Sequence, residues 1–210
     1  MIYAENILIC IAVPLAISAL YVKGNARRFV ITFLIGMITC LLAAYIGGFY
    51  KLASGLSNDD TSIFISPVVE EILKLLPILF FINVFELKGK EVLLTAVGIG
   101  TGFATFENCC YILNSSAQNL SIILIRGAAV GVMHIVSMVT LAMVLHVLKR
   151  VNIFSFAGIM GALSFSMTFH AFYNLLVSEP GIPSYLGYAL PLITAVLLCF
   201  IDRKLKLSDM

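Results

Sequence analysis

Apolar residues occur along this chain in long blocks that are separated by short polar loops. Windows of about 20 predominantly apolar residues have the length that crosses a bilayer as a helix. Seven such windows are present, and the third can begin as early as Ile63. They run over Ile2–Val22, Phe29–Tyr50, Pro67–Leu87, Val92–Leu113, Asn119–Leu148, Phe154–Val177 and Tyr185–Ile201. We therefore predict an all-α, polytopic transmembrane helix bundle of about seven spans, with residues 1–210 forming a single integral membrane domain.

The composition supports a membrane protein. Hydrophobic residues make up 61% of the chain and charged residues 11%, whereas a soluble domain carries about 25% charged residues. This composition predicts that the chain lies in the lipid bilayer. The net charge of +2 is too small to indicate a nucleic-acid partner. The five cysteines form no C-x-x-C pair, and we interpret them as small buried hydrophobic residues.

Loop charge predicts the orientation of the chain. Lys and Arg are concentrated in every second loop, and cytoplasmic loops carry the excess of these residues. The basic loops are Lys23–Arg28, Val84–Glu91, Lys149–Ile153 and the stretch after Ile201. This alternation places the N-terminus outside and the C-terminus in the cytoplasm, which requires an odd number of spans.

The third window carries three ionisable residues, Glu70, Glu71 and Lys74, inside its apolar run. A charged side chain at the centre of a membrane helix costs about 2.5–3.5 kcal/mol on insertion scales, so such residues usually mark a functional site. Lys74 can contact either glutamate along one helix face. One of the two acids is then left without a lysine partner and is a candidate general base. Ser66–Pro67 resembles a helix start and would place both acids near the positive end of the helix dipole.

Three further windows place ionisable residues at a similar depth in the predicted outer half of the membrane. In chain order, the residues and their polar neighbours are Glu107, Asn108, Arg126, His134, Ser166, His170 and Asn174. His170 and Asn174 are one helical turn apart and can donate two convergent hydrogen bonds to an oxyanion. Packing alternatives remain open: glycines 98, 100, 102, 127 and 131 would bring helices close together, and Glu107 would pair with Arg126 or Lys74.

Several protease classes are excluded by the motifs that the sequence lacks. The four aspartates lie outside the apolar windows, which excludes an intramembrane aspartate dyad. Neither H-E-x-x-H nor G-x-S-x-G occurs, which removes the usual zinc-peptidase and serine-hydrolase signatures. Glutamate and histidine chemistry remains.

The four polar groups resemble the ordered motifs of the PrsW family, within the wider group of CAAX-prenyl-protease-like (ABI) membrane peptidases. The motifs cover the core at about residues 67–177. They are Glu70-Glu71-x-x-Lys74, Phe103-x-x-x-Glu107-Asn108, Arg126 with His134 eight residues later, and His170-x-x-x-Asn174.

The resemblance implies a bacterial, multi-pass cell-membrane protease that makes the first cut in a single-pass anti-sigma factor, near the outer membrane surface. It implies a catalytic core of Glu70, Glu71, His134 and His170, supported by Lys74, Glu107, Asn108, Arg126 and Asn174. We expect one glutamate to activate water without a cofactor; the alternative is zinc held by the four core residues. Two other functions stay open: a CAAX-type prenyl-peptide peptidase, and a non-enzymatic proton-coupled transporter or scaffold.

Overall fold

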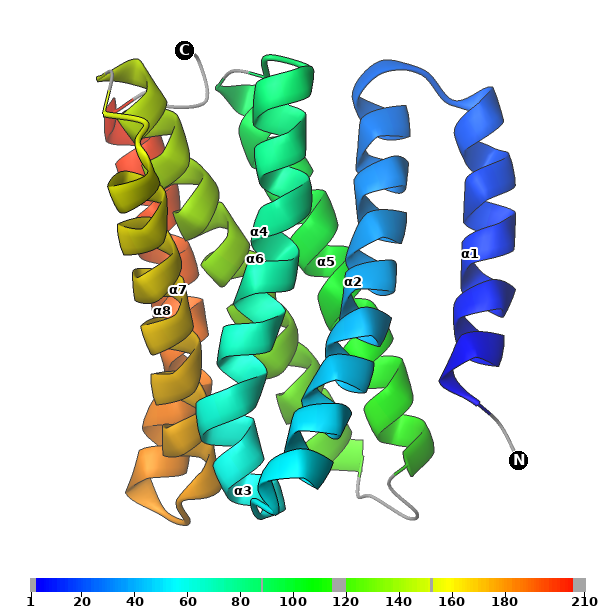
Figure 1. Cartoon of the computed structure of the whole chain (residues 1–210), viewed down its shortest axis with the longest axis vertical. Coiled ribbons are helices and arrows are strands. Elements are labelled where there is room, and N and C mark those ends of the chain that lie inside the picture. The colour runs from blue at the N-terminus through cyan, green and yellow to red at the C-terminus, as the bar shows by residue number, and fades with distance from the viewer. Residues whose placement is uncertain (1–2, 88, 115–119, 152, 206–210) are drawn as a thin grey trace.

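Each apolar window of the sequence forms one long helix. The computed structural model describes residues 3–87, 89–114, 120–151 and 153–205, without the side chains at 114, 120, 122, 123, 126 and 205. The long helices of this described part are α1 (Ala4–Tyr21), α2 (Gly24–Ser54), α4 (Ser66–Val84), α5 (Lys90–Asn114), α6 (Leu120–Arg150), α7 (Phe156–Ser178) and α8 (Ile182–Leu205) (Figure 1). The predicted all-α class is confirmed.

Five of these helices, α1, α2, α5, α6 and α8, are long and apolar enough to cross a membrane. The chain is therefore a multi-pass membrane protein. The two remaining long helices are α4, which carries Glu70, Glu71 and Lys74 within its apolar run, and α7, which carries His170. The count of seven spans stays a prediction, and so does the orientation of the termini.

The α-helix α4 begins at Ser66, as predicted, but this start is not a free helix terminus. The short helix α3 (Asn58–Asp60) leads into a π-helix, η1 (Thr61–Ile65), which continues directly into α4. The Ser66 backbone N–H already bonds the carbonyl of Thr61, so no free helix terminus lies beside the two acids. The dipole contribution that the sequence suggested is absent at this position. Single π-helical turns within a helix occur frequently at functional sites.

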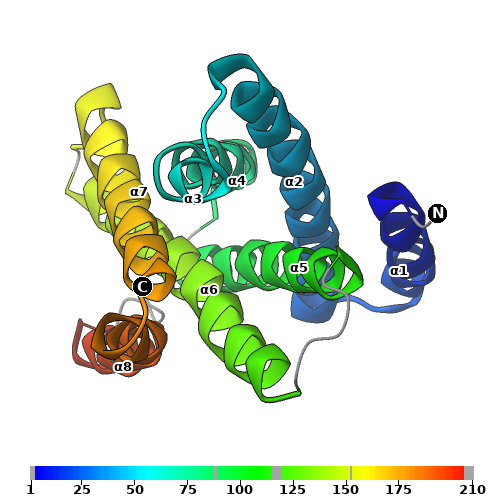
Figure 2. The same ribbon diagram turned by 90° about the horizontal axis from the view of Figure 1, so that it is seen from below.

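Helix α4 contacts four other helices and leaves one apolar face exposed. It packs against α2, α5, α6 and α7, while α1 covers the outside of α2 and α8 lies against α6 and α7 (Figure 2). The start of α4 and the end of α7 lie at the same end of the bundle, which is also the end where α1 begins. Helix α8 ends at the opposite end, as an odd number of crossings requires.

Glycines allow α5 to approach both neighbouring helices closely, as the sequence predicted. At Gly102 and Gly98 an added β-carbon would collide with Phe33 and Thr32 of α2. At Gly100 it would lie 2.9 Å from the Ile135 Cα of α6. The same prediction is wrong for Gly127, which is exposed and has open space around it. Two cysteine predictions are also wrong, since Cys10 and Cys199 lie exposed on the bundle surface.

The buried face of α4 divides into a charged part and an apolar part. Glu71 and Lys74 are buried near its start, whereas Ile78 and Ile82 are buried further along. The two isoleucines belong to a core cluster with α5, α6 and α7, for example with Leu141. The buried charged residues of α4 are therefore confined to the half of this helix that is nearer its start.

Candidate active site

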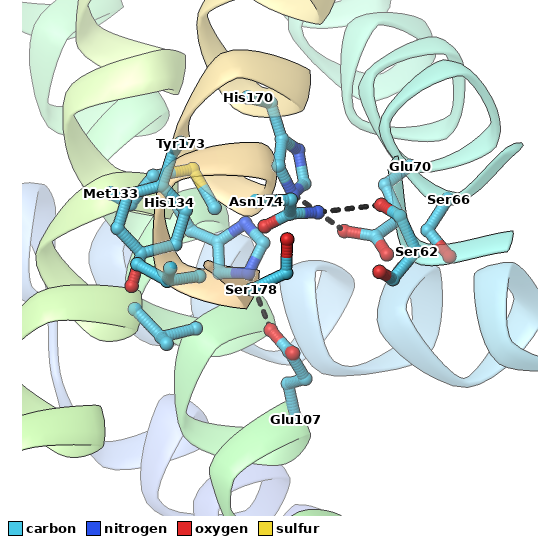
Figure 3. Close-up of a pocket in the computed structure, with 12 residues that line it drawn as sticks. Ser62, Ser66, Glu70, Glu107, Met133, His134, His170, Tyr173, Asn174 and Ser178 are labelled. Atoms are coloured by element: carbon cyan, nitrogen blue, oxygen red, sulfur yellow. Dashed lines mark hydrogen bonds and ion pairs between the residues drawn. The ribbon is translucent and has the colours of Figure 1, made fainter. Parts of the chain in front are cut away.

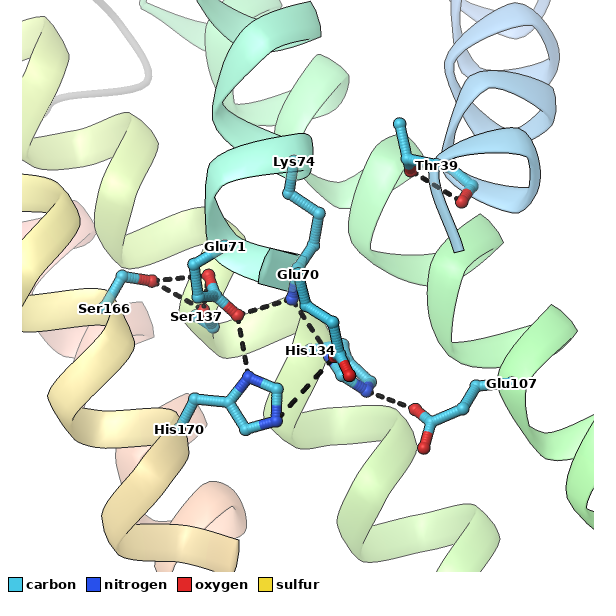
Figure 4. A network of polar contacts seen from close by, with 10 residues as sticks. Thr39, Glu70, Glu71, Lys74, Glu107, His134, Ser137, Ser166 and His170 are labelled. Carbon is cyan, nitrogen blue, oxygen red and sulfur yellow. Dashed lines mark hydrogen bonds and ion pairs between the residues drawn. The ribbon is translucent and has the colours of Figure 1, made fainter. Parts of the chain in front are cut away.

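The carboxylate of Glu71 is fully buried and is held by four donors from three helices (Figure 4). Its Oε1 accepts from Lys74 Nζ at 2.5 Å and from His170 Nδ1 at 2.9 Å. Its Oε2 accepts from Ser137 Oγ at 2.6 Å and from Ser166 Oγ at 2.7 Å. An ionised carboxylate accepts and never donates, which suits this set of partners. With both oxygens occupied, Glu71 is placed to orient its neighbours rather than to take a proton from water.

His134 lies between a cation and a second carboxylate. Its Nδ1 is 3.1 Å from Lys74 Nζ, and its Nε2 contacts Glu107 Oε2. An ammonium group only donates, so Nδ1 accepts and Nε2–H donates to Glu107. The Phe103 ring covers this pair, with its centroid 4.7 Å from the imidazole and 4.6 Å from Lys74 Nζ. The ring excludes water from one side of the lysine and adds a cation–π contact.

Glu70, in contrast, faces a cavity of about 220 Å³ (Figure 3). Its Oε2 lies 3.9 Å from His170 Nε2. The cavity is lined by residues of η1, α4, α5, α6 and α7. Its lining residues are Ser62, Ser66, Glu70, Glu107, Val130, Met133, His134, His170, Tyr173, Asn174, Val177 and Ser178. Of the two adjacent glutamates, therefore, Glu70 borders the cavity and Glu71 supports its wall.

The cavity extends from the histidines towards the end of the bundle where α4 begins. Ser62 of η1 and Ser178, the last residue of α7, both line it. Eight residues separate His170 from Ser178, which is about 12 Å along a helix at 1.5 Å per residue. His170 thus lies about two helical turns from that end of the bundle.

The sequence predicted that His170 and Asn174 would donate together to an oxyanion, and the structure uses these donors differently. His170 Nδ1 is directed at Glu71, while Asn174 Nδ2 donates to the backbone carbonyl of Ser62 at 2.7 Å. Asn174 therefore ties η1 to α7 at the wall of the cavity.

The supporting residues predicted from the sequence are only partly brought together. Lys74, Glu107 and Asn174 surround the histidines, as described above. Asn108 is half-buried and is not among the described residues that line the cavity. The Arg126 side chain lies outside the described part of the structure. Glu107 contacts His134, whereas Lys74, one of the two partners of the packing alternative, contacts Glu71 and His134. The pairing of Glu107 with Arg126, the other partner, stays a prediction.

Sequence reasoning missed Ser137, Ser62 and Ser66. Ser137 follows His134 by three residues, so both lie on one face of α6. A polar residue at that spacing in an otherwise apolar helix was a usable signal. Ser66 carried a similar signal, because it precedes Glu70 by four residues on α4. Ser62 lies in the π-helix, which the sequence did not predict, and this turn brings it to the cavity.

Glu70, His134 and His170 each present one ligand atom, and these atoms lie within 4.8 Å of one another. His170 fits a metal well, because its Nδ1–H donates to Glu71 and its Nε2 lone pair remains for the cavity side. Such carboxylate–histidine pairs are the usual support of a metal-bound imidazole. His134 fits once one of its two ring contacts, with Lys74 or Glu107, is exchanged for the metal. Two histidines and one glutamate form a donor set that suits zinc.

Comparison with known proteins gives one match. A family model described as "PrsW family intramembrane metalloprotease" matches residues 25–201, which is most of the chain. No curated protein and no solved structure matches. The family description implies a metal cofactor, so the expectation of a cofactor-free site is wrong. The donor set of Glu70, His134 and His170 is the feature of the fold that fits this correction.

Proposed function

Because the chain belongs to the PrsW family of intramembrane metalloproteases, we propose that it hydrolyses its membrane-protein substrate in the cavity between α4, α5, α6 and α7. The chain is a peptide hydrolase, which sets aside the transporter and scaffold alternative. The observation that carries the proposal is the convergence of Glu70, His134 and His170, from three helices, on one polar cavity.

In the proposed site, Glu70, His134 and His170 hold the metal. A bound divalent cation lowers the pKa of water and polarises the carbonyl of the peptide. Glu71 keeps a hydrogen on His170 Nδ1, so that the Nε2 lone pair of His170 points into the cavity. Lys74 balances the charge of Glu71 and donates to His134 Nδ1.

Glu107 is the second carboxylate on the cavity wall. We propose that it acts as the general base, which takes a proton from the attacking water. It is 30% exposed, whereas Glu71 is fully buried, so water reaches Glu107 and not Glu71. In the structure its contact with His134 Nε2 places Glu107 next to the proposed metal ligands, and because Lys74 donates to Nδ1, the Glu107 contact is the one that the metal would replace. Loss of a general base typically reduces the rate by about 10²–10⁴-fold.

Two glutamine variants separate these roles. Glu70→Gln is expected to lose both zinc binding and cleavage, whereas Glu107→Gln is expected to keep zinc and lose cleavage by about 10²–10⁴-fold. His146→Ala is the control, since His146 lies near the opposite end of α6. The measurements are cleavage of a single-pass substrate in liposomes and zinc content of the purified protein. Full activity of Glu70→Gln would refute the proposed site.

We further propose that the cut falls near the outer membrane surface of a single-pass substrate such as an anti-sigma factor. The position of the cavity, about two helical turns from the end where α4 begins, supports a juxtamembrane cut. The substrate class rests on the sequence motifs alone. A CAAX-type peptidase would need this cavity to face the cytoplasm, so mass spectrometry of the cleaved ends separates the two functions.

The proposed protease occupies one membrane domain, residues 1–210, with its motif-bearing core at about 67–177. The family match, which extends across the bundle from residue 25 to 201, supports this organisation. A bacterial cell membrane is the proposed location, again from the motifs.

A further inference from the structure

Two serine hydroxyls from different helices meet at one oxygen of Glu71. Ser137 of α6 and Ser166 of α7 lie 2.6 Å and 2.7 Å from Glu71 Oε2, and 2.7 Å from each other. Both side chains are buried, with 1% of their surface exposed. Neither is among the described residues that line the cavity. They therefore act on the site only through Glu71.

The two hydroxyls make the oxygens of Glu71 inequivalent. A carboxylate can turn about the bond that joins it to the side chain, and a partial turn would move its oxygens out of line with Lys74 and His170. Lys74 alone would hold either oxygen, because an ammonium is a point charge without a preferred direction. The hydroxyl pair occupies Oε2 and leaves Oε1 for Lys74 and His170.

This arrangement has a consequence for His170. A neutral imidazole carries one hydrogen, and the partner of one nitrogen decides which nitrogen has it. The acceptor fixed in front of Nδ1 is Glu71 Oε1, so the hydrogen stays on Nδ1 and the Nε2 lone pair faces Glu70 and the cavity. A Glu71 carboxylate free to rotate would hold this tautomer less firmly.

We propose that Ser137 and Ser166 are positioning residues of the active site, which lock Glu71 so that His170 presents its Nε2 lone pair to a metal. The inference rests on the proposed function for the metal itself. Outer-shell partners of this kind typically change metal affinity or activity by about 10–100-fold when they are replaced.

The direct test measures the tautomer of His170 in metal-free protein. The chain has three histidines, so ¹⁵N-histidine labelling gives few imidazole signals, which are assigned with the His170→Ala variant. We expect wild-type His170 to carry its hydrogen on Nδ1, and the double variant Ser137→Ala/Ser166→Ala to show a mixture with the Nε2–H form. Ser164→Ala is the matched control, because Ser164 lies exposed on α7 two residues before Ser166.

The second readout is zinc affinity, measured by titration in detergent micelles. We expect the double variant to bind zinc about 10–100-fold more weakly than wild type, and Ser164→Ala to match wild type. A hydroxyl pair that only joined α4, α6 and α7 would lower thermal stability and leave the tautomer unchanged. Replacement by threonine, which keeps the hydroxyl, is expected to restore the Nδ1–H form.

Each outcome decides the proposal. An unchanged His170 tautomer in the double variant, with zinc affinity within twofold of wild type, overturns it. If the double variant does not fold, the two single variants replace it, and an unshifted tautomer in both overturns the proposal. If wild-type protein binds no zinc, the metal centre under "Proposed function" fails, whereas the tautomer comparison still decides the role of the serines.

Discussion

Replacement of Lys74 by methionine tests how the buried charges hold the site together. Lys74 is fully buried and lies 2.5 Å from Glu71, its ion-pair partner. Removal of one member of a buried ion pair costs about 3–5 kcal/mol, because the other charge is left uncompensated. Glu71 keeps the donors His170, Ser137 and Ser166, so we expect the lower end of that range, about 3 kcal/mol. A total stability of about 5–15 kcal/mol would leave a folded but weakened protein.

The double variant Glu71→Gln/Lys74→Met removes both charges and shows whether pairing is the cause. If it is, the double variant loses less stability than the two single variants together, with a coupling of about 0.5–3 kcal/mol. Lys23→Met is the control, since Lys23 is exposed, and surface changes usually stay within about 0.5 kcal/mol. The free energy of unfolding is measured by SDS titration in mixed micelles. Equal stability of Lys74→Met and Lys23→Met would refute the reasoning.

Three further predictions concern packing, metal and topology. Gly36→Ala should push α2 away from α5 and lower the thermal stability, because its β-carbon would lie 2.8 Å from Phe103 N. Gly48→Ala is the control: its β-carbon meets no atom within 4 Å, so it should unfold at the wild-type temperature. Thermal unfolding of both variants tests this prediction. A chelator should abolish cleavage and added zinc should restore it; activity that survives metal removal would contradict the metal site. In a cysteine-free background, Asp59→Cys should label from outside intact cells and Val151→Cys should not; the reverse result would invert the orientation.

The sequence by itself determined the helices and the identity of the polar residues. A window of about 20 apolar residues has few alternatives to a helix in a bilayer, because backbone groups there must be satisfied within the segment. This is why predicted windows such as Pro67–Leu87 and Val92–Leu113 coincide closely with α4 and α5. The cost of ionisable groups at membrane depth singled out Glu70, Glu71 and His170 for the same physical reason.

The tertiary structure decided which of these residues meet and what each one faces. Glu70 and Glu71 are neighbours in sequence, but successive residues on a helix point about 100° apart, so one lines the cavity and the other lies in the bundle interior. Ser137 and Ser166 become partners of Glu71 across gaps of 66 and 95 residues. Such contacts depend on how α4, α6 and α7 pack. That packing results from side-chain contacts and close helix approaches over the whole bundle, so it cannot be read from a local sequence pattern.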